Sequence, residues 1–356
     1  MKALVLGSGK SGEAAKAVLL AQGYEVESVE GFDLVVASPG VPVKSELQVG
    51  CERLKRCGTK LLAVTGSKGK SSVVKLVAEA VGGVPCGNYG LPVSAVGPCE
   101  WAVVEVSSFQ LETTHLPRDT FEAAAILNLQ ADHLDRHGGA DVYHALKRAL
   151  LGMTPRPIAS PEDVPDAPEL YQGSYFDNEV LRGNARIAVA LMRVAGLRDE
   201  AIRAAFRSFR PLPHRLQPIA EIDGVRYVDD SKATSVAALD AGVRMAASKC
   251  TGGIRLIAGG RPKGDNPKSA LPVLTKQVKK VYLIGESAEV FSKAWSGEVA
   301  CEICGTLERA VEVARREAVK GEVVLLSPGT ASFDQFKSFE ERGDAFADFV
   351  KKGKKE

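Results

Sequence analysis

The residues best suited to chemistry form the run Gly66-Ser67-Lys68-Gly69-Lys70-Ser71-Ser72. An apolar stretch, Leu61–Thr65, leads into it, and an apolar helical pattern follows over residues 73–81. In such a strand–loop–helix, backbone N–H groups approach phosphate oxygens and the helix directs its positive end at the anion. Lys70 is placed for the β- and γ-phosphates and Ser71 for Mg²⁺. The run predicts a nucleotide site, although its first glycine stands closer to Gly-Lys-Ser than in the general pattern.

Two further groups could hold the metal. Glu105 lies near the end of a strand predicted at Ala102–Val106, and His133 follows a strand at Ala123–Leu127 among acidic neighbours. Carboxyl ends of parallel strands share one edge of a sheet, so these side chains are expected near the glycine loop. A surface glutamate and an ordinary polar histidine remain the alternatives. Lys147, in a helical stretch, has by itself the pattern of a solvent-facing lysine.

A third set of polar residues follows Pro211-Leu212-Pro213. Arg215 could stack on or hydrogen-bond a nucleotide, and Asp230 could hold a ribose hydroxyl. Three loops that end predicted strands should converge on one crevice. Side chains on these loops that suit an anionic small molecule are Lys232, Thr234, Lys263 and Ser332. Any one of them alone could be ordinary turn chemistry.

The elements that position these residues fall into three βα alternations. The first joins a strand at Lys2–Leu6 to a helix through Gly7-x-Gly9-x-x-Gly12, with further strands near Glu25–Val29 and Asp33–Ala37. The pattern restarts at Lys60 and again after the proline segment. We predict an α/β protein of three domains. They are a small Rossmann-like N-terminal domain (1–56), a central P-loop ATPase-type domain with a mainly parallel sheet (57–211), and a C-terminal Rossmann-like domain (212–356).

Composition excludes several classes of function. The 356 residues include 46 basic and 44 acidic ones, a net charge of +2, so no nucleic-acid partner is expected. No apolar run is long enough to span a bilayer, and the N-terminus lacks the features of a signal peptide. The seven cysteines predict a reducing compartment, the cytoplasm. Cys301 and Cys304 form a C-x-x-C that could bind metal or be redox-active, but ordinary thiols are favoured.

Taken in this order, the motifs resemble the Mur ligases, and most closely their D-glutamate-adding members. The resemblance runs nearly end to end and includes Ser38-Pro39-Gly40-Val41-Pro42, the glycine loop and the run from Glu105 to Glu112. It continues with Asp132-His133-Leu134-Asp135-Arg136, Leu212-Pro213-His214-Arg215, Asp230-Ser231-Lys232-Ala233-Thr234 and the run from Ser327 to Glu340. The tight glycine spacing is the normal form in this family.

The resemblance implies an ATP-dependent carbon–nitrogen ligase of the cytoplasmic stage of peptidoglycan synthesis. ATP and Mg²⁺ are the expected cofactors, and the expected partners are the small molecules UDP-N-acetylmuramoyl-L-alanine and D-glutamate. ATP would phosphorylate the terminal carboxylate, and the D-glutamate amine would attack the acyl phosphate. A monomer without membrane insertion is expected.

The resemblance also implies roles for individual residues. Lys70, Glu105, His133 and Lys147 would be catalytic, with Ser71 and Glu105 on one Mg²⁺ and His133 with a carbamylated Lys147 at a second. ATP would contact the glycine loop and Asn184, Arg215 and Asp230. Substrates would contact Lys10, Ser11, Gly40, Asn88, Lys232, Thr234, Lys263, Ser332 and Phe339.

The chain departs from the family where it is shorter, in the first domain and between Lys147 and Asn184. No acidic residue stands clearly after the second strand of the first domain, so no uracil contact is assigned there. Alternatives within enzymes are another Mur ligase or a folylpolyglutamate synthase, and the alternative outside them is a nucleotide-switched binding protein. A third α/β domain with its own anion-suited loops argues against a switch, which needs only a phosphate loop and mobile segments.

Overall fold

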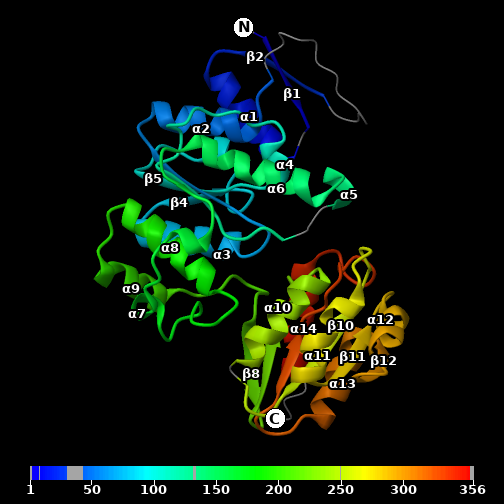
Figure 1. Ribbon diagram of the computed structural model, residues 1–356. Coiled ribbons are helices and arrows are strands. Elements are labelled where there is room, and N and C mark those ends of the chain that lie inside the picture. Colours follow the sequence, from blue (N-terminus) through cyan, green and yellow to red (C-terminus); the bar gives the residue numbers. More distant parts are fainter. Residues whose placement is uncertain (1, 8, 30–42, 131–133, 249, 353–356) are drawn as a thin grey trace. The chain divides into compact units, whose positions relative to one another are not determined.

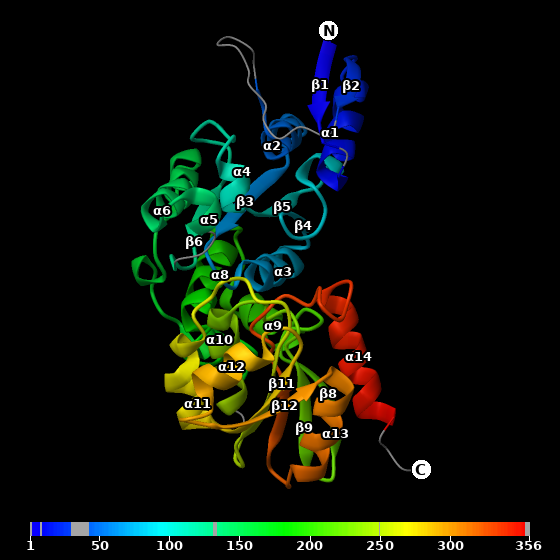
Figure 2. The ribbon, with the colours of Figure 1, turned by 90° about the vertical axis from the view of Figure 1, so that its right-hand side faces the viewer.

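The computed structural model describes residues 2–7, 9–29, 43–130, 134–248 and 250–352 (Figures 1 and 2). They form two compact units, Met1–Phe209 and Arg210–Glu356. Three sheets, mainly parallel, are covered by helices, so the predicted α/β fold class is confirmed. The boundaries at 56/57 and 211/212 stay a prediction.

The N-terminal sheet has two parallel strands, β1 (Lys2–Leu6) and β2 (Glu25–Val29), joined through α1 (Lys10–Ala21). The turn between β1 and α1 is tight, because a Cβ on Gly12 would collide with the carbonyl of Gly7. Glycine at this position therefore lets the helix start against the end of the strand.

The central sheet of the first unit is entirely parallel. Its strands, in spatial order, are β4 (Val84–Gly87), β5 (Trp101–Glu105), β3 (Lys60–Thr65), β6 (Ala123–Ile126) and β7 (Pro157–Ile158). Helix α2 (Glu46–Arg56) packs against one face, while α3 (Lys70–Val81) and α8 (Arg182–Val194) pack together on the other (Figure 1). The middle strands are largely apolar because both faces of the sheet are buried.

The other helices of this unit are short. They are η1 (Val93–Ala95), α4 (Ser108–Leu111), α5 (Leu134–His137), α6 (Ala140–Ala149), η2 (Leu150–Met153), η3 (Pro161–Asp163), α7 (Pro168–Tyr171) and α9 (Asp199–Ser208). In the shortened stretch before α8, Asp166 accepts hydrogen bonds from Tyr171 Oη (2.6 Å) and Arg182 Nε (2.7 Å). These bonds fix the chain that enters α8.

The second unit holds one six-stranded sheet. Its strands, in spatial order, are β12 (Ala300–Gly305), β11 (Val278–Ile284), β10 (Ile254–Gly259), β13 (Val323–Leu326), β9 (Val225–Asp229) and β8 (Gln217–Ile222). Only the pairing of β8 with β9 is antiparallel among these described strands. One face packs against α10 (Val236–Ala247), α11 (Leu271–Gln277) and α12 (Ala288–Trp295), and the short η4 (Pro267–Ala270) leads into α11. The other packs against α13 (Leu307–Glu317) and α14 (Phe339–Lys352).

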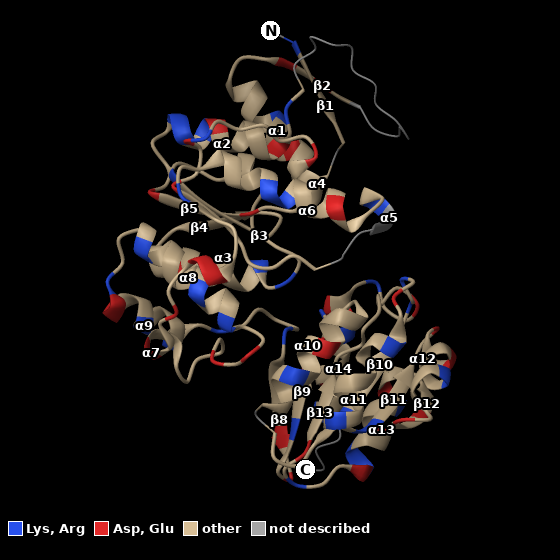
Figure 3. Cartoon of the chain, viewed as in Figure 1, with Lys and Arg blue, Asp and Glu red and all other residues tan. Residues whose placement is uncertain are grey.

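At the amino ends of these strands lies a network of charged side chains. Glu322, 1% exposed, accepts from Arg255 Nε (2.6 Å) and Lys279 Nζ (2.8 Å). Glu317 accepts from Lys280 Nζ (2.9 Å) and Tyr282 Oη (2.8 Å). Elsewhere acidic and basic side chains are mixed over both units (Figure 3). Within the described residues, no helix has the length and apolar character needed to cross a membrane.

Candidate functional site

The glycine loop leaves β3 between the ends of two neighbouring strands, β5 and β6. Residues that follow β6 hold it in place. Lys68 N donates to Asn128 Oδ1 (2.9 Å), and Asn128 Nδ2 returns a bond to Lys68 O (3.0 Å). Ser67 Oγ donates to Gln130 O at 2.8 Å. The loop is thus shaped before any ligand binds, which lowers the cost of binding a phosphate.

Asn184 lies against this loop from α8. Gly69 has a φ of 83°, and a Cβ there would collide with the Asn184 side chain. Asn184 is 5% exposed. The structure therefore brings together the glycine loop and a residue predicted from a distant segment to contact ATP.

Two lysines converge on the carbonyl oxygen of Gly66. Lys70 Nζ lies 2.9 Å from it and 3.3 Å from Ser67 O, and Lys147 Nζ also lies 2.9 Å from Gly66 O. Lys147 is 1% exposed and sits 4.6 Å from the Tyr143 ring centroid. The solvent-facing position that its helical pattern suggested is wrong, because α6 turns this face toward the loop.

Glu105 ends β5 next to the phosphate loop and is 2% exposed. Asn88 Nδ2 donates to its Oε1 at 2.7 Å. Its Oε2 is buried and has no hydrogen-bond partner among the described residues. A buried carboxylate oxygen left in this way is costly unless a cation or donor meets it. A carboxylate oxygen such as this one and a hydroxyl such as that of Ser71, in the first turn of α3, are the kind of oxygen donors that Mg²⁺ takes.

Several residues predicted to bind metal or substrate cannot be placed against the glycine loop from the part of the chain that the structure describes. His133 and Gly40 lie outside the described residues. Among the residues that the structure does describe, no group of three or more His, Cys, Asp or Glu could hold a metal. Lys10 and Ser11 are exposed at the start of α1, and their role toward a uridine diphosphate stays a prediction.

In the second unit, the three predicted loops do meet. They follow neighbouring strands, β10, β13 and β9. Gly329 N donates to Ala233 O (2.8 Å), and Arg261 pairs with Ala331. Thr234, Lys263 and Ser332 lie on these loops, with Lys263 exposed and Ser332 2% exposed.

Two positions in this unit have distinctive environments. Burial raises the pKa of Asp230 to about 7, although a hydrogen bond from Ser327 (2.8 Å) and the charge of Arg215 lower it. Lys232 Nζ lies 3.7 Å from the ring centroid of Phe339, a cation–π contact. Phe339 and Lys232 are therefore in contact, and their role toward a substrate stays a prediction.

Sequence reasoning missed the residue that ties these loops together. Arg342 is 1% exposed and donates to Ser231 Oγ (2.9 Å), Ser231 O (2.9 Å), Thr330 O (3.1 Å) and Ala331 O (3.2 Å). Burial lowers the pKa of this guanidinium to about 10, so it stays charged at neutral pH. No role was predicted for Asn128, for Tyr143 or for Asp229, whose Oδ2 lies 2.7 Å from His214 Nδ1. Tyr143 could have been found as an aromatic four residues before Lys147.

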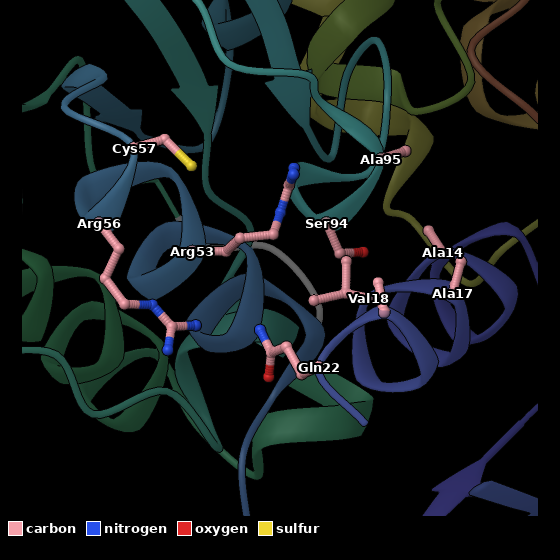
Figure 4. A pocket seen from close by; sticks show the side chains of 10 residues that line it. Ala14, Ala17, Val18, Gln22, Arg53, Arg56, Cys57, Ser94 and Ala95 are labelled. Atoms are coloured by element: carbon pink, nitrogen blue, oxygen red, sulfur yellow. The ribbon is translucent and has the colours of Figure 1, made fainter. Parts of the chain in front are cut away.

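A separate hollow lies between α1, α2 and η1 (Figure 4). Arg53, Arg56 and Cys57 border it, and none of the predicted site residues does. Cys57 is exposed, whereas the other six cysteines are buried or half-buried. Cys301 and Cys304 pack against opposite faces of the second-unit sheet, so this C-x-x-C cannot act as a pair.

Comparisons with known proteins agree with this architecture. Models of the Mur ligase middle domain and of the Mur ligase, glutamate ligase domain match residues 91–159 and 214–330. The UDP-N-acetylmuramoylalanine--D-glutamate ligase of Acidobacterium capsulatum is 33% identical over 454 residues, covering 98% of this chain and 96% of the relative. That of Rubrobacter xylanophilus is 36% identical over 436 residues, with 97% of each chain covered. Since both alignments exceed the 356 residues of this chain, the relatives carry segments that it lacks.

Among solved structures, the MurF ligase of Thermotoga maritima in complex with ADP has a TM-score of 0.66. It is 16% identical, and 99% of this chain and 95% of that one are covered. At this identity the likeness concerns the fold.

Proposed function

This chain belongs to the Mur ligase family, and we propose that it joins D-glutamate to UDP-N-acetylmuramoyl-L-alanine in a reaction driven by ATP. The structural observation that carries the proposal is the unpartnered, buried Oε2 of Glu105 beside the phosphate loop. The relatives that bear this activity in their names align with nearly the whole chain, which supports the choice of amino acid.

The proposed reaction has two steps. A carboxylate oxygen of the L-alanyl group attacks the γ-phosphorus of ATP, which releases ADP and gives an acyl phosphate. The amine of D-glutamate then attacks the acyl carbon, loses a proton, and expels inorganic phosphate as the amide forms. Phosphoryl transfer of this kind depends on alignment and charge neutralisation rather than on covalent participation of the protein.

In this proposal the first unit binds the phosphates. Backbone N–H groups of residues 66–72 surround them, and Lys70 leaves the carbonyls of Gly66 and Ser67 to reach the transferred phosphoryl group. Lys147 lies close enough to the same loop to act there as a carbamate, whose added carboxylate would be a metal ligand with His133. Asn184 would contact the nucleotide from α8.

Mg²⁺ would be held by Glu105 Oε2 and Ser71 and would neutralise charge on the phosphate oxygens. Asn88 fixes the Glu105 carboxylate through Oε1 and so leaves Oε2 as the ligand. We propose that Lys10, Ser11 and Gly40 contact the UDP part of the acceptor.

In the second unit we propose that Arg215 and Asp230 hold the nucleoside. Lys232, Thr234, Lys263, Ser332 and Phe339 would surround D-glutamate, whose two carboxylates suit the lysines. We also propose that the protein works as a monomer in the cytoplasm, where seven free cysteines would stay reduced.

A substrate panel tests the proposal. Release of phosphate from ATP is measured with UDP-N-acetylmuramoyl-L-alanine and each of D-glutamate, L-glutamate, L-alanine and L-lysine. Rapid release is expected only with D-glutamate and acceptor together. Equal release with ATP alone would contradict a ligase, and preference for another amino acid would contradict the proposed substrate.

A further inference from the structure

A buried histidine with no assigned role joins two helices beside the candidate phosphate site. His137 is the last residue of α5, and its side chain is 2% exposed. Its Nε2 lies 3.0 Å from Ser108 Oγ, and its Nδ1 lies 3.2 Å from Glu112 Oε1. Ser108 begins α4 and Glu112 is its C-terminal cap. Both ring nitrogens of His137 therefore hold α4.

The direction of these hydrogen bonds follows from Glu112. Arg136 donates to its two oxygens at 2.8 and 3.4 Å, and this pairing lowers the pKa of the Glu112 carboxyl. An ionised carboxylate only accepts, so His137 Nδ1 carries the proton that Glu112 receives. In the neutral imidazole Nε2 then accepts from the Ser108 hydroxyl.

This order of carboxylate, imidazole and hydroxyl is the one found in hydrolytic triads. Ser108 is 2% exposed, however, so its hydroxyl is not open to a substrate. The arrangement is suited to fixing helices, not to nucleophilic attack.

The helices that His137 contacts adjoin groups of the proposed site. Glu105 precedes Ser108 by three residues, and Ser107 between them caps α4. On its other side the His137 ring lies 5.6 Å from the ring of Tyr143 on α6, and Tyr143 Oη donates to Ser67 Oγ at 3.1 Å. Helices α4, α5 and α6 lie side by side in both ribbon views (Figures 1 and 2). His137 thus connects the Glu105 turn to the support of the phosphate loop.

We propose that His137 is a positioning residue of the ligase reaction. Through its contacts with Ser108, Glu112 and Tyr143, it holds the turn after Glu105 at a fixed position relative to the phosphate loop. This rests on the proposed function, since it assumes that Glu105 binds the metal. The consequence is that His137 affects metal affinity and turnover without touching a substrate.

The test compares His137→Leu with His137→Asn in the full chain. Both variants lose the ring, but the amide nitrogen of asparagine can replace Nδ1 as the donor to Glu112. We expect kcat to fall about 100-fold for leucine, which removes both hydrogen bonds, and about tenfold for asparagine, which removes one, within the range seen for residues that orient a metal ligand. KM for ATP should change little. Mn²⁺ affinity, measured by calorimetric titration in the presence of ADP, should fall about tenfold for leucine, as for other residues that orient a ligand.

His115→Gln is the matched control, because His115 is exposed just beyond α4. It should behave as wild type. The inference is wrong if both His137 variants keep wild-type turnover and Mn²⁺ affinity, or if both lose turnover equally with no change in Mn²⁺ affinity. If wild type and control form no amide, the proposed function fails instead, and the Mn²⁺ titration still reports on His137.

Discussion

Lys70 and Lys147, 77 positions apart in the sequence, both donate a hydrogen bond of 2.9 Å to the carbonyl oxygen of Gly66. Two ammonium groups at one oxygen repel each other, and Lys147 has almost no contact with water. Converting Lys147 to a carbamate would replace a positive charge with a negative one beside Lys70. The crowding of charge therefore supports the proposed modification.

Replacement of Lys147 by alanine should lower kcat at least about 100-fold, the usual loss when a positioned charge is removed. Added short carboxylic acids should restore part of the activity, because they can enter the space left by the side chain and supply a carboxylate. The measurement is the steady-state rate at increasing formate or acetate. Arg148→Ala, at the exposed neighbouring position, should keep wild-type activity without the additive. Absence of any rescue would argue against the carbamate.

Glu105→Gln should lower the activity of the protein without lowering its thermal stability. Loss of the charge should lower kcat about 100- to 1,000-fold, in the range seen for electrostatic groups of active sites. Thermal stability should stay the same or rise, because a buried, partly unpartnered carboxylate is replaced by a neutral amide that can still accept from Asn88. Glu100→Gln, at an exposed residue just before β5, should change neither quantity. A large drop in melting temperature would show that Glu105 is structural.

The raised pKa of Asp230 makes its contribution to stability depend on pH. Its value of about 7 in the folded protein exceeds the ordinary 3.8, so the folded state holds this proton more tightly than the unfolded state. Ionised Asp230 therefore destabilises the protein increasingly as pH rises from 3.8, with the full cost above 7. Asp230→Asn should stabilise the protein at pH 8 by a few kcal/mol, with a smaller gain at pH 5. Urea unfolding at the two pH values measures this difference, and an equal effect at both would contradict it.

Glu322 should show the opposite dependence. Burial alone would raise its pKa, but hydrogen bonds from Lys279, Val319 N and Arg255 lower it below the ordinary 4.5. The ionised Glu322 therefore stabilises the folded state fully above pH 4.5. This stabilisation is lost as the pH falls through the lowered pKa of Glu322 in the folded protein. Glu322→Gln should cost about 1.5–3 kcal/mol at pH 7, and less in acid. Hydrogen exchange of the β10 and β13 amides in the full chain reports the loss.

Much of the fold could be predicted because buried parallel strands are continuous apolar runs. The strands at Lys2–Leu6 and Glu25–Val29 agree with the structure at both ends. β4 was missed because it is four residues long and contains Pro85 and Gly87. β8 and β12 were missed because edge strands are exposed and carry polar residues. The strand expected at Asp33–Ala37 lies outside the described residues.

Local pattern was enough to predict the strand–loop–helix around the glycine loop and the place of Glu105 at the end of β5, whereas the roles of these residues stay a prediction. No role was predicted for Asn128 or Arg342, because their roles depend on which loops lie beside them, and single asparagines and arginines are common on surfaces. Lys147 illustrates the limit most clearly. Its helical pattern alone suggested a side chain that faces solvent, and only the tertiary packing of α6 explains its burial.

The different exposure of the seven cysteines allows a dye to be attached at one chosen position. Cys57 is exposed at the hollow beside α1 (Figure 4), while burial raises the pKa of the Cys51, Cys86, Cys99, Cys301 and Cys304 thiols. Thiolates react with maleimides and thiols do not, so a brief exposure near neutral pH should attach a fluorophore mainly at Cys57. That dye would report ligand-dependent movement of the N-terminal segment in the otherwise native protein.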